Sequence, residues 1–142
     1  MNKLYTKDHF WLEKVVPDSP IRGAILPRLN QENLYIFGAT EHGIHELGEV
    51  VAIDVYQGNY KANEAFGTIE SRKAVVDLTI SVPCTLVREN QLMGREDIKY
   101  LQSFNENPEQ VWIALLELDT SCSSNVSFMS KNQYDRFCTK TD

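Results

Sequence analysis

Apolar and polar positions alternate along much of the chain with a period of two, which is the spacing of a β-strand with one buried face. Runs of this kind, each ended by turn residues, predict strands over residues 9–16, 33–37, 49–56, 82–88 and 111–118. The Gln-Gly-Asn run at 57–59 predicts a turn. Short strands with closely spaced turns predict a mainly β fold, in which antiparallel strands form a flattened barrel or sandwich of two layers.

Two segments are typical of short helices that would lie at the ends of these layers. Thr40 is a common helix N-cap, Glu41 follows where the helix dipole favours an acidic residue, and Gly48 stands where a glycine commonly ends a helix. These signals predict a helix over 41–47. A second helix is predicted over 94–104, with its apolar residues packed inward.

A β-hairpin is predicted between residues 65 and 80. Apolar residues lead into it and out of it, and four polar residues lie between them: Glu70, Ser71, Arg72 and Lys73. None of the four favours burial, so Lys73 is expected at the exposed tip or just past it. A lysine held on a rigid hairpin is a suitable attachment point for a prosthetic group. For an isolated lysine, the alternative is an ordinary solvated turn residue.

The motif around this lysine resembles the lipoylation site of the glycine cleavage system H protein. Other segments similar to that family are the opening at 4–11, the stretch from Phe37 to Val51, and the single residues Asn90, Leu92 and Trp112. The similarity covers roughly residues 4–119, and the motifs occur in the family's order. It implies the family's fold, a lipoyl-domain-like hammerhead with the modified lysine on a hairpin.

The resemblance also implies a function. Lys73 would carry lipoate in amide linkage, and Glu70 and Ser71 would help a lipoate ligase or an octanoyl or lipoyl transferase to recognise the turn. The lipoyl group would carry an aminomethyl intermediate from glycine decarboxylase to aminomethyltransferase, and dihydrolipoyl dehydrogenase would reoxidise it. On this hypothesis the chain is a carrier and not itself an enzyme, because the partner enzymes and the cofactor supply the chemistry.

Two alternatives remain open at this point. The first is an H-like lipoyl carrier of another pathway, in oxidative stress or sulfur metabolism, which could also be ADP-ribosylated. It is favoured by a Pro-rich insertion, by Arg72 in place of the family's small apolar residue, and by Cys84 where the family has a turn glycine. A non-glycine residue would be strained there if the turn required a positive φ. The second alternative is an interaction module that is never lipoylated.

Composition and charge narrow the choice of partners. The 142 residues carry a net charge of −6, with scattered Lys and Arg, which argues against binding nucleic acid. No apolar run reaches the ~20 residues of a membrane helix, and the N-terminus has no apolar signal core. We therefore expect a cytoplasmic protein, or one in an organelle matrix after loss of a presequence, without membrane or nucleic-acid partners.

The cysteines and histidines predict no metal or disulfide site. The chain has three of each, without a Cys-x-x-Cys pair, and an odd number of cysteines does not form a disulfide framework. His42 and His45 could share one face of the short helix, but two surface histidines are the simpler interpretation. Cys84 is interpreted as a small, partly buried residue.

Changes in composition along the chain predict its domain organisation. Residues 1–119 are expected to form the lipoyl-carrier domain, interrupted at about 16–31 by an insertion that holds three of the five prolines. Residues 120–142 are rich in Ser, Asn, Lys and Thr, and form either a weak C-terminal helix or a disordered tail. Because this tail shows no strand pattern, we expect that it can be removed without loss of folding.

Overall fold

The structure of the protein, a computed structural model, describes residues 3–15, 33–90, 97–119 and 128–141. The insertion predicted at about 16–31 lies outside the described residues, as do Leu92 and Cys122. No helix of the described residues is long and apolar enough to cross a membrane.

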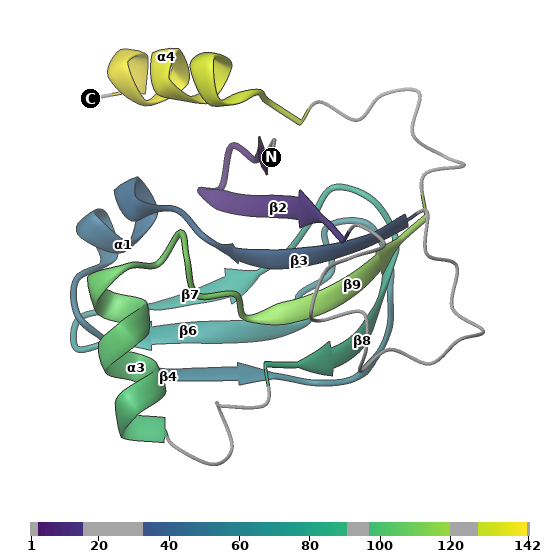
Figure 1. Ribbon diagram of the computed structural model, residues 1–142, viewed down its shortest axis with the longest axis horizontal. Coiled ribbons are helices and arrows are strands. Elements are labelled where there is room, and N and C mark those ends of the chain that lie inside the picture. The colour runs from purple at the N-terminus through teal and green to yellow at the C-terminus, as the bar shows by residue number, and fades with distance from the viewer. Residues whose placement is uncertain (1–2, 16–32, 91–96, 120–127, 142) are drawn as a thin grey trace.

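The strands of the described residues form two sheets (Figure 1). The larger sheet contains, in spatial order, β1 (Lys3–Tyr5), β2 (Phe10–Lys14), β3 (Leu34–Ala39), β9 (Ala114–Leu118), β8 (Cys84–Glu89) and β5 (Gly58–Tyr60). The smaller sheet contains β4 (Val50–Val55), β6 (Gly67–Ser71) and β7 (Val75–Leu78). Neighbouring strands are antiparallel throughout. The prediction of a mainly β fold in two layers is confirmed.

The core lies between the two sheets and anchors the hairpin β6–β7 to the rest of the molecule. Phe37 of β3 and Phe66, which precedes β6, meet edge to face with ring centroids 5.1 Å apart. Ile69 of β6 and Leu116 of β9 are buried in the same cluster. Burial of one large apolar side chain contributes about 1.5–3 kcal/mol. The base of the hairpin is therefore held firmly, while its turn projects beyond the core.

Close contact between β4 and β6 also fixes the base of the hairpin. A Cβ atom at Gly67 would collide with the backbone oxygen of Asp54 on the paired strand. Only glycine permits this approach, so the first residue of β6 is set tightly against β4.

The first predicted helix is confirmed. Helix α1 (Glu41–Leu47) begins after Thr40, whose Oγ1 accepts a hydrogen bond from the backbone N–H of Gly43 at 3.0 Å. It ends at Gly48, which has φ +92° and donates its N–H to the carbonyl oxygen of Ile44 at 2.9 Å. A left-handed backbone of this kind favours glycine, and it turns the chain sharply into β4.

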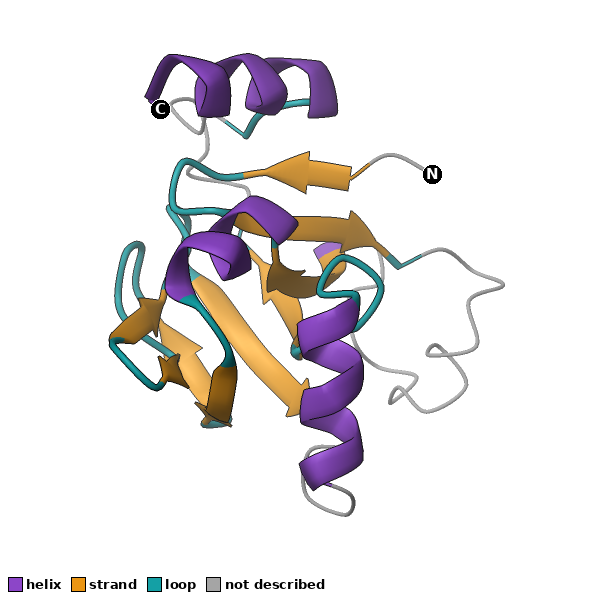
Figure 2. Cartoon of the chain, turned by 90° about the vertical axis from the view of Figure 1, so that its left-hand side faces the viewer, coloured by secondary structure: helices purple, strands orange, loops and turns teal. Residues whose placement is uncertain are grey.

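The second predicted helix is confirmed with shifted bounds, but the expected inward packing of its apolar residues is wrong for Ile98, which is 76% exposed. Helix α3 spans Asp97–Glu106, and the start predicted at residue 94 lies outside the described residues. Asn105 ties the helix to β4, because its side chain accepts from the backbone N–H of Val50 at 2.8 Å and donates to that residue's carbonyl oxygen at 3.0 Å. Figure 2 shows α1 and α3 at one end of the sheets, with the C-terminal helix above them.

One local prediction was wrong. The expected turn at 57–59 lies partly in strand β5, in which Gly58 pairs with Leu86 and Tyr60 with Cys84. A three-residue edge strand has too short a pattern to be recognised in the sequence. Cys84 lies in strand β8 without a positive φ, so the turn that would have strained it is not formed there. It is a small buried residue, as its interpretation from the sequence indicated.

The strand predicted over 9–16 is confirmed as β2, but the sequence analysis missed β1, with which β2 forms a hairpin. His9 ends the turn of this hairpin with φ +72°, a left-handed conformation that is uncommon for a residue other than glycine. The turn is held by the backbone N–H of Thr6, which donates to the carbonyl oxygen of Phe10 at 2.9 Å.

The described part of the C-terminal tail packs against the rest of the protein, and whether it is dispensable for folding stays a prediction. Helix α4 spans Lys131–Thr141, so the helical alternative holds for this part of the tail. Tyr134 is only 2% exposed, and its ring stacks on that of Tyr5 with centroids 4.8 Å apart. Met129 and Tyr5 exchange backbone hydrogen bonds of 2.8 Å. The division of the chain at residue 119 stays a prediction.

Candidate functional site

The turn that carries Lys73 is a short hairpin turn, as the sequence predicts. Glu70 pairs with Val75 in the β6–β7 register, and the backbone N–H of Ser71 donates to the carbonyl oxygen of Ala74 at 2.8 Å. Arg72 and Lys73 are therefore the two residues of the turn itself. Both are exposed, and neither has a positive φ.

Ser71 holds this turn from inside, which corrects the expectation that all four polar residues avoid burial. Its side chain is 4% exposed, and its Oγ accepts hydrogen bonds from the backbone N–H groups of Lys73 and Ala74, both at 3.2 Å. A serine hydroxyl that satisfies two amide groups fixes the backbone of a turn. The sequence showed a polar turn but not which of its side chains points inward.

The two turn side chains lie beside the loop that follows α1. Arg72 points to Glu49, with 3.2 Å between Nε and Oε1. The Cε atom of Lys73 lies near Gly48, 3.7 Å from where a Cβ atom of that residue would stand. Both partners of the ion pair are largely exposed, so it contributes little to stability. It does direct the arginine toward α1 and leaves the lysine as the exposed amine of the turn.

Glu70 lies on the outward face of β6. Its neighbours along the strand, Ile69 and Ser71, face inward. Val75, which pairs with Glu70 from strand β7, is 62% exposed. Glu70 and Val75 thus present an acidic and an apolar side chain next to the lysine, on a surface that a partner protein could contact.

A groove of about 630 Å³ runs from the hairpin toward the N-terminal turn. Val76 and Asp77 of β7 line one part of it, close in sequence to Lys73. Ile44 and Leu47 of α1 and His9 of the β1–β2 turn line other parts. The lining mixes apolar side chains with the carboxylates of Asp8, Glu46 and Asp77, so the groove suits a chain that is apolar along its length and ends in a polar or cationic group.

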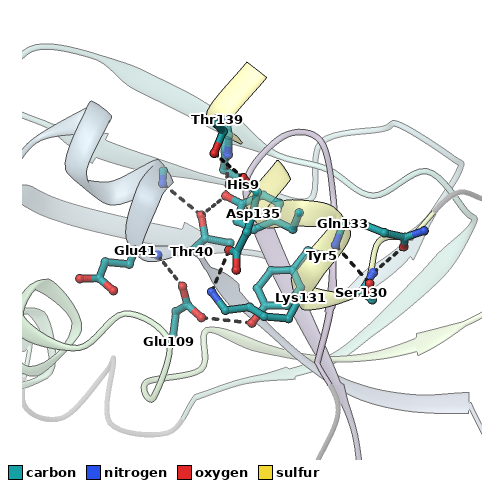
Figure 3. A network of polar contacts seen from close by, with 12 residues as sticks. Tyr5, His9, Thr40, Glu41, Glu109, Ser130, Lys131, Gln133, Asp135 and Thr139 are labelled. Atoms are coloured by element: carbon teal, nitrogen blue, oxygen red, sulfur yellow. Dashed lines mark hydrogen bonds and ion pairs between the residues drawn. The ribbon is translucent and has the colours of Figure 1, made fainter. Parts of the chain in front are cut away.

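A second group of polar side chains lies where α4 meets α1 and the β1–β2 turn. The hydroxyl of Tyr134 is 2.6 Å from Nδ1 of His9 and 2.7 Å from Oγ1 of Thr40. Figure 3 shows the surrounding network, in which the Glu109 carboxylate accepts hydrogen bonds from the backbone N–H of Glu41 and the hydroxyl of Tyr5. Burial raises the pKa of Tyr134, so it remains a neutral phenol at ordinary pH. Burial and the nearby Glu109 carboxylate raise the pKa of Tyr5, on the same side, to about 12.

The same region brings together side chains that the sequence analysis did not connect. His9, His42 and Cys138 each place a potential metal-ligating atom within 4.8 Å of the other two. The sequence paired His42 with His45, but His45 is exposed and is not part of this group. Sequence spacing could not reveal it, because the three residues come from separate elements and meet only in the folded chain.

Comparison with known proteins decides the family. A family model described as glycine cleavage H-protein matches residues 27–141, which is most of the chain. The chain belongs to the glycine cleavage H-protein family. The glycine cleavage system H protein of Chlorobaculum parvum is 30% identical over 122 residues, which cover 84% of this chain and 82% of that protein. The H protein 2 of Arabidopsis thaliana, a mitochondrial protein, is 28% identical over 113 residues, which cover 78% and 69%.

A solved structure agrees with this assignment. The crystal structure of a glycine cleavage system H protein from Mycobacterium marinum superposes with a TM-score of 0.67 over 98% of this chain and 95% of that one, at 18% sequence identity. At this identity the likeness shows the fold, and it confirms the lipoyl-domain-like architecture. The family match reaches residue 141, beyond the limit of 119 expected from the motifs, and it includes α4.

Membership of this family confirms the first functional hypothesis. The protein is a lipoyl carrier of the glycine cleavage H type, and its cofactor is covalently attached lipoate. The relatives support this function and not the H-like carrier of another pathway. Known relatives include bacterial proteins and a mitochondrial one.

Proposed function

We propose that Lys73 carries the lipoyl group of this carrier. The observation that supports it is the geometry of the turn: Lys73 is exposed, its backbone is fixed by Ser71, and Arg72 is held in an ion pair with Glu49. A fixed turn presents one amine in one place, which is what an enzyme that modifies a single lysine requires. The residues present therefore fit covalently bound lipoate.

The roles of the neighbouring residues follow from their positions. Glu70, exposed on the outward face of β6, would be contacted directly by the lipoate ligase or the octanoyl or lipoyl transferase. Ser71 is buried, so it would act by setting the shape of the turn. The recognition role expected for Glu70 and Ser71 is thus divided into a contact and a structural part.

The groove beside the hairpin would receive the modified side chain between encounters with partners. It begins next to Val76 and Asp77, and the apolar side chains in its mixed lining suit the hydrocarbon part of a lipoyl-lysine arm. The Asp77 carboxylate would attract the positive charge of a bound aminomethyl group. Shelter of this kind excludes water from the carried group while the carrier is free in solution.

The proposed partners are glycine decarboxylase, aminomethyltransferase and dihydrolipoyl dehydrogenase, in the cytoplasm or in an organelle matrix. Bound lipoate supplies a disulfide that opens to accept the aminomethyl group and is later reoxidised. The chain itself would bind, present and release the arm, and the partner enzymes would carry out each reaction.

Reconstitution of the pathway tests this function. Lipoylated protein should support NAD⁺ reduction when it is mixed with glycine, tetrahydrofolate and the three partner enzymes, and the Lys73→Arg variant should support none. Lys61→Arg, which removes another exposed lysine, is the matched control and should behave like the parent. If the lipoylated parent protein is inactive with all three enzymes, the glycine cleavage assignment fails in favour of another pathway. If the protein isolated from its own host has an unmodified mass, it is an interaction module.

A further inference from the structure

Three side chains with metal-ligating atoms meet where the two ends of the chain come together. His9 lies in the β1–β2 turn, His42 in α1 and Cys138 in α4. Each of the three residues offers one ligating atom, and these three atoms all lie within 4.8 Å of one another. The centroids of the His9 and His42 imidazole rings are 4.7 Å apart. All three are at least partly shielded from solvent.

The two histidines have different neighbours. Nδ1 of His9 is 2.6 Å from the Tyr134 hydroxyl. Nε2 of His42 lies 3.3 Å from a carboxylate oxygen of Glu46, which is an ion-pair distance and not an aligned hydrogen bond. Metal-binding histidines commonly have one nitrogen on the ion and the other hydrogen-bonded to an oxygen group, and His9 has such a partner in Tyr134. Binding through Nε2 of His9 would preserve that contact.

We propose that His9, His42 and Cys138 form a binding site for a divalent transition-metal ion, and that zinc is the ion the site suits. Two imidazoles and one thiolate are a mixed nitrogen and sulfur ligand set of the kind that zinc accepts, with a fourth position for water. The site is separate from Lys73 and goes beyond the carrier function.

The distances are compatible with such an ion after a small adjustment. Zinc–nitrogen and zinc–sulfur bonds of about 2.0–2.3 Å in a tetrahedron place the ligand atoms about 3.3–3.6 Å apart. The ligand atoms, which lie up to 4.8 Å apart, therefore have to approach one another by up to about 1.2–1.5 Å. Side-chain rotations supply this movement, because the three residues are not fully buried and belong to three separate elements.

Ion binding would join α4 to the carrier domain. His9 and His42 belong to the N-terminal half of the chain, and Cys138 lies near its end. An ion that binds only the folded arrangement stabilises it by mass action. His9 also lines the groove beside the hairpin, so the proposed ion would lie next to the far end of that groove.

The test is metal titration of the full chain in the Lys73→Arg background, which excludes binding by a lipoyl dithiol. Zn²⁺ is measured by competition with a chromophoric chelator, and Co²⁺ is used to detect thiolate coordination by its charge-transfer absorption. We expect one ion per chain and a thiolate band. His42→Gln and Cys138→Ser should each weaken Zn²⁺ binding at least tenfold, and Cys138→Ser should abolish the band.

Matched controls are His45→Gln, on the same helix as His42, and Cys122→Ser, which removes another thiol. Both should bind as tightly as the parent. A second measurement needs no variant: Zn²⁺ should slow alkylation of Cys138 in the parent chain, with the modified peptide identified by mass spectrometry. The proposal is overturned if no ion binds at one equivalent, if binding is equally tight in His42→Gln, or if Zn²⁺ leaves Cys138 alkylation unchanged.

Discussion

At the scale of single residues, burial decides what a polar side chain does. Ser71 and Lys73 are two positions apart in the same polar run, yet the serine is buried against the backbone and the lysine is exposed. The sequence predicted the exposed lysine because a polar run between strands forms a turn. It could not predict the buried hydroxyl, because the direction of each turn side chain depends on hydrogen bonds within the turn.

Cys84 gives a prediction at this scale. It is 5% exposed, and burial raises its pKa to about 12 from the ordinary 9.0. Between pH 9 and pH 12 the thiol of the unfolded chain loses its proton while the thiol of the folded chain keeps it. Deprotonation therefore stabilises the unfolded state relative to the folded state as pH rises. The contribution of Cys84 to stability is therefore present below about pH 9 and is lost toward pH 12.

The measurement is the free energy of unfolding by urea at a series of pH values. In Cys84→Ala this free energy should fall less steeply between pH 9 and 12 than in the parent. Tyrosines with raised pKa values contribute the same pH dependence of the unfolding free energy to both proteins. The effect of Cys84 is therefore the difference between the two curves. Parallel curves would contradict the assignment of a buried, protonated thiol.

At the scale of elements, the sequence predicted those helices and strands that are specified by neighbouring residues, and it missed those that depend on contacts with distant parts of the chain. Helix α1 and the hairpin β6–β7 were predicted because caps, turn residues and alternation all lie within a few positions. Strand β5 and the packing of α4 were missed, because a short edge strand and a polar helix acquire their structure from partners elsewhere. Tyr134 meets its partner His9 from 125 positions away.

The packing of α4 leads to a second prediction. Tyr134→Ala should reduce the free energy of unfolding by about 3–5 kcal/mol, as for other large buried aromatic residues. Tyr134→Phe keeps the ring but leaves the groups around the hydroxyl less well satisfied, and should cost about 1–3 kcal/mol. Arg136→Ala, exposed on the same helix, is the control and should change stability by less than about 0.5 kcal/mol. A Tyr134→Ala protein as stable as this control would show that the tail is dispensable after all.

At the scale of the whole molecule, the two ends of the chain pack together and the hairpin lies apart from them. Tyr5 pairs with Met129, and α4 covers β1 and the β1–β2 turn (Figure 1). The mainly β architecture was predictable, because its strands repeat one period and the motifs resemble one family. The contact between the termini was not, because it unites residues that share no local pattern. The group of His9, His42 and Cys138 is a consequence of that contact.

The most direct test of the account is the position and rate of lipoate attachment. The parent chain and the double variant Arg72→Lys with Lys73→Arg are each incubated with a lipoate ligase, ATP and lipoate, and the adduct is mapped by peptide mass spectrometry. The exchange preserves charge and lysine count, but it places the amine beside the Glu49 carboxylate. Circular dichroism should show both proteins folded. The parent should be lipoylated at Lys73 and the exchanged protein only at a small fraction of that rate. Modification at Lys61 or Lys99, or equal rates in the two proteins, would contradict the claim that this fixed turn presents Lys73 as the lipoyl site.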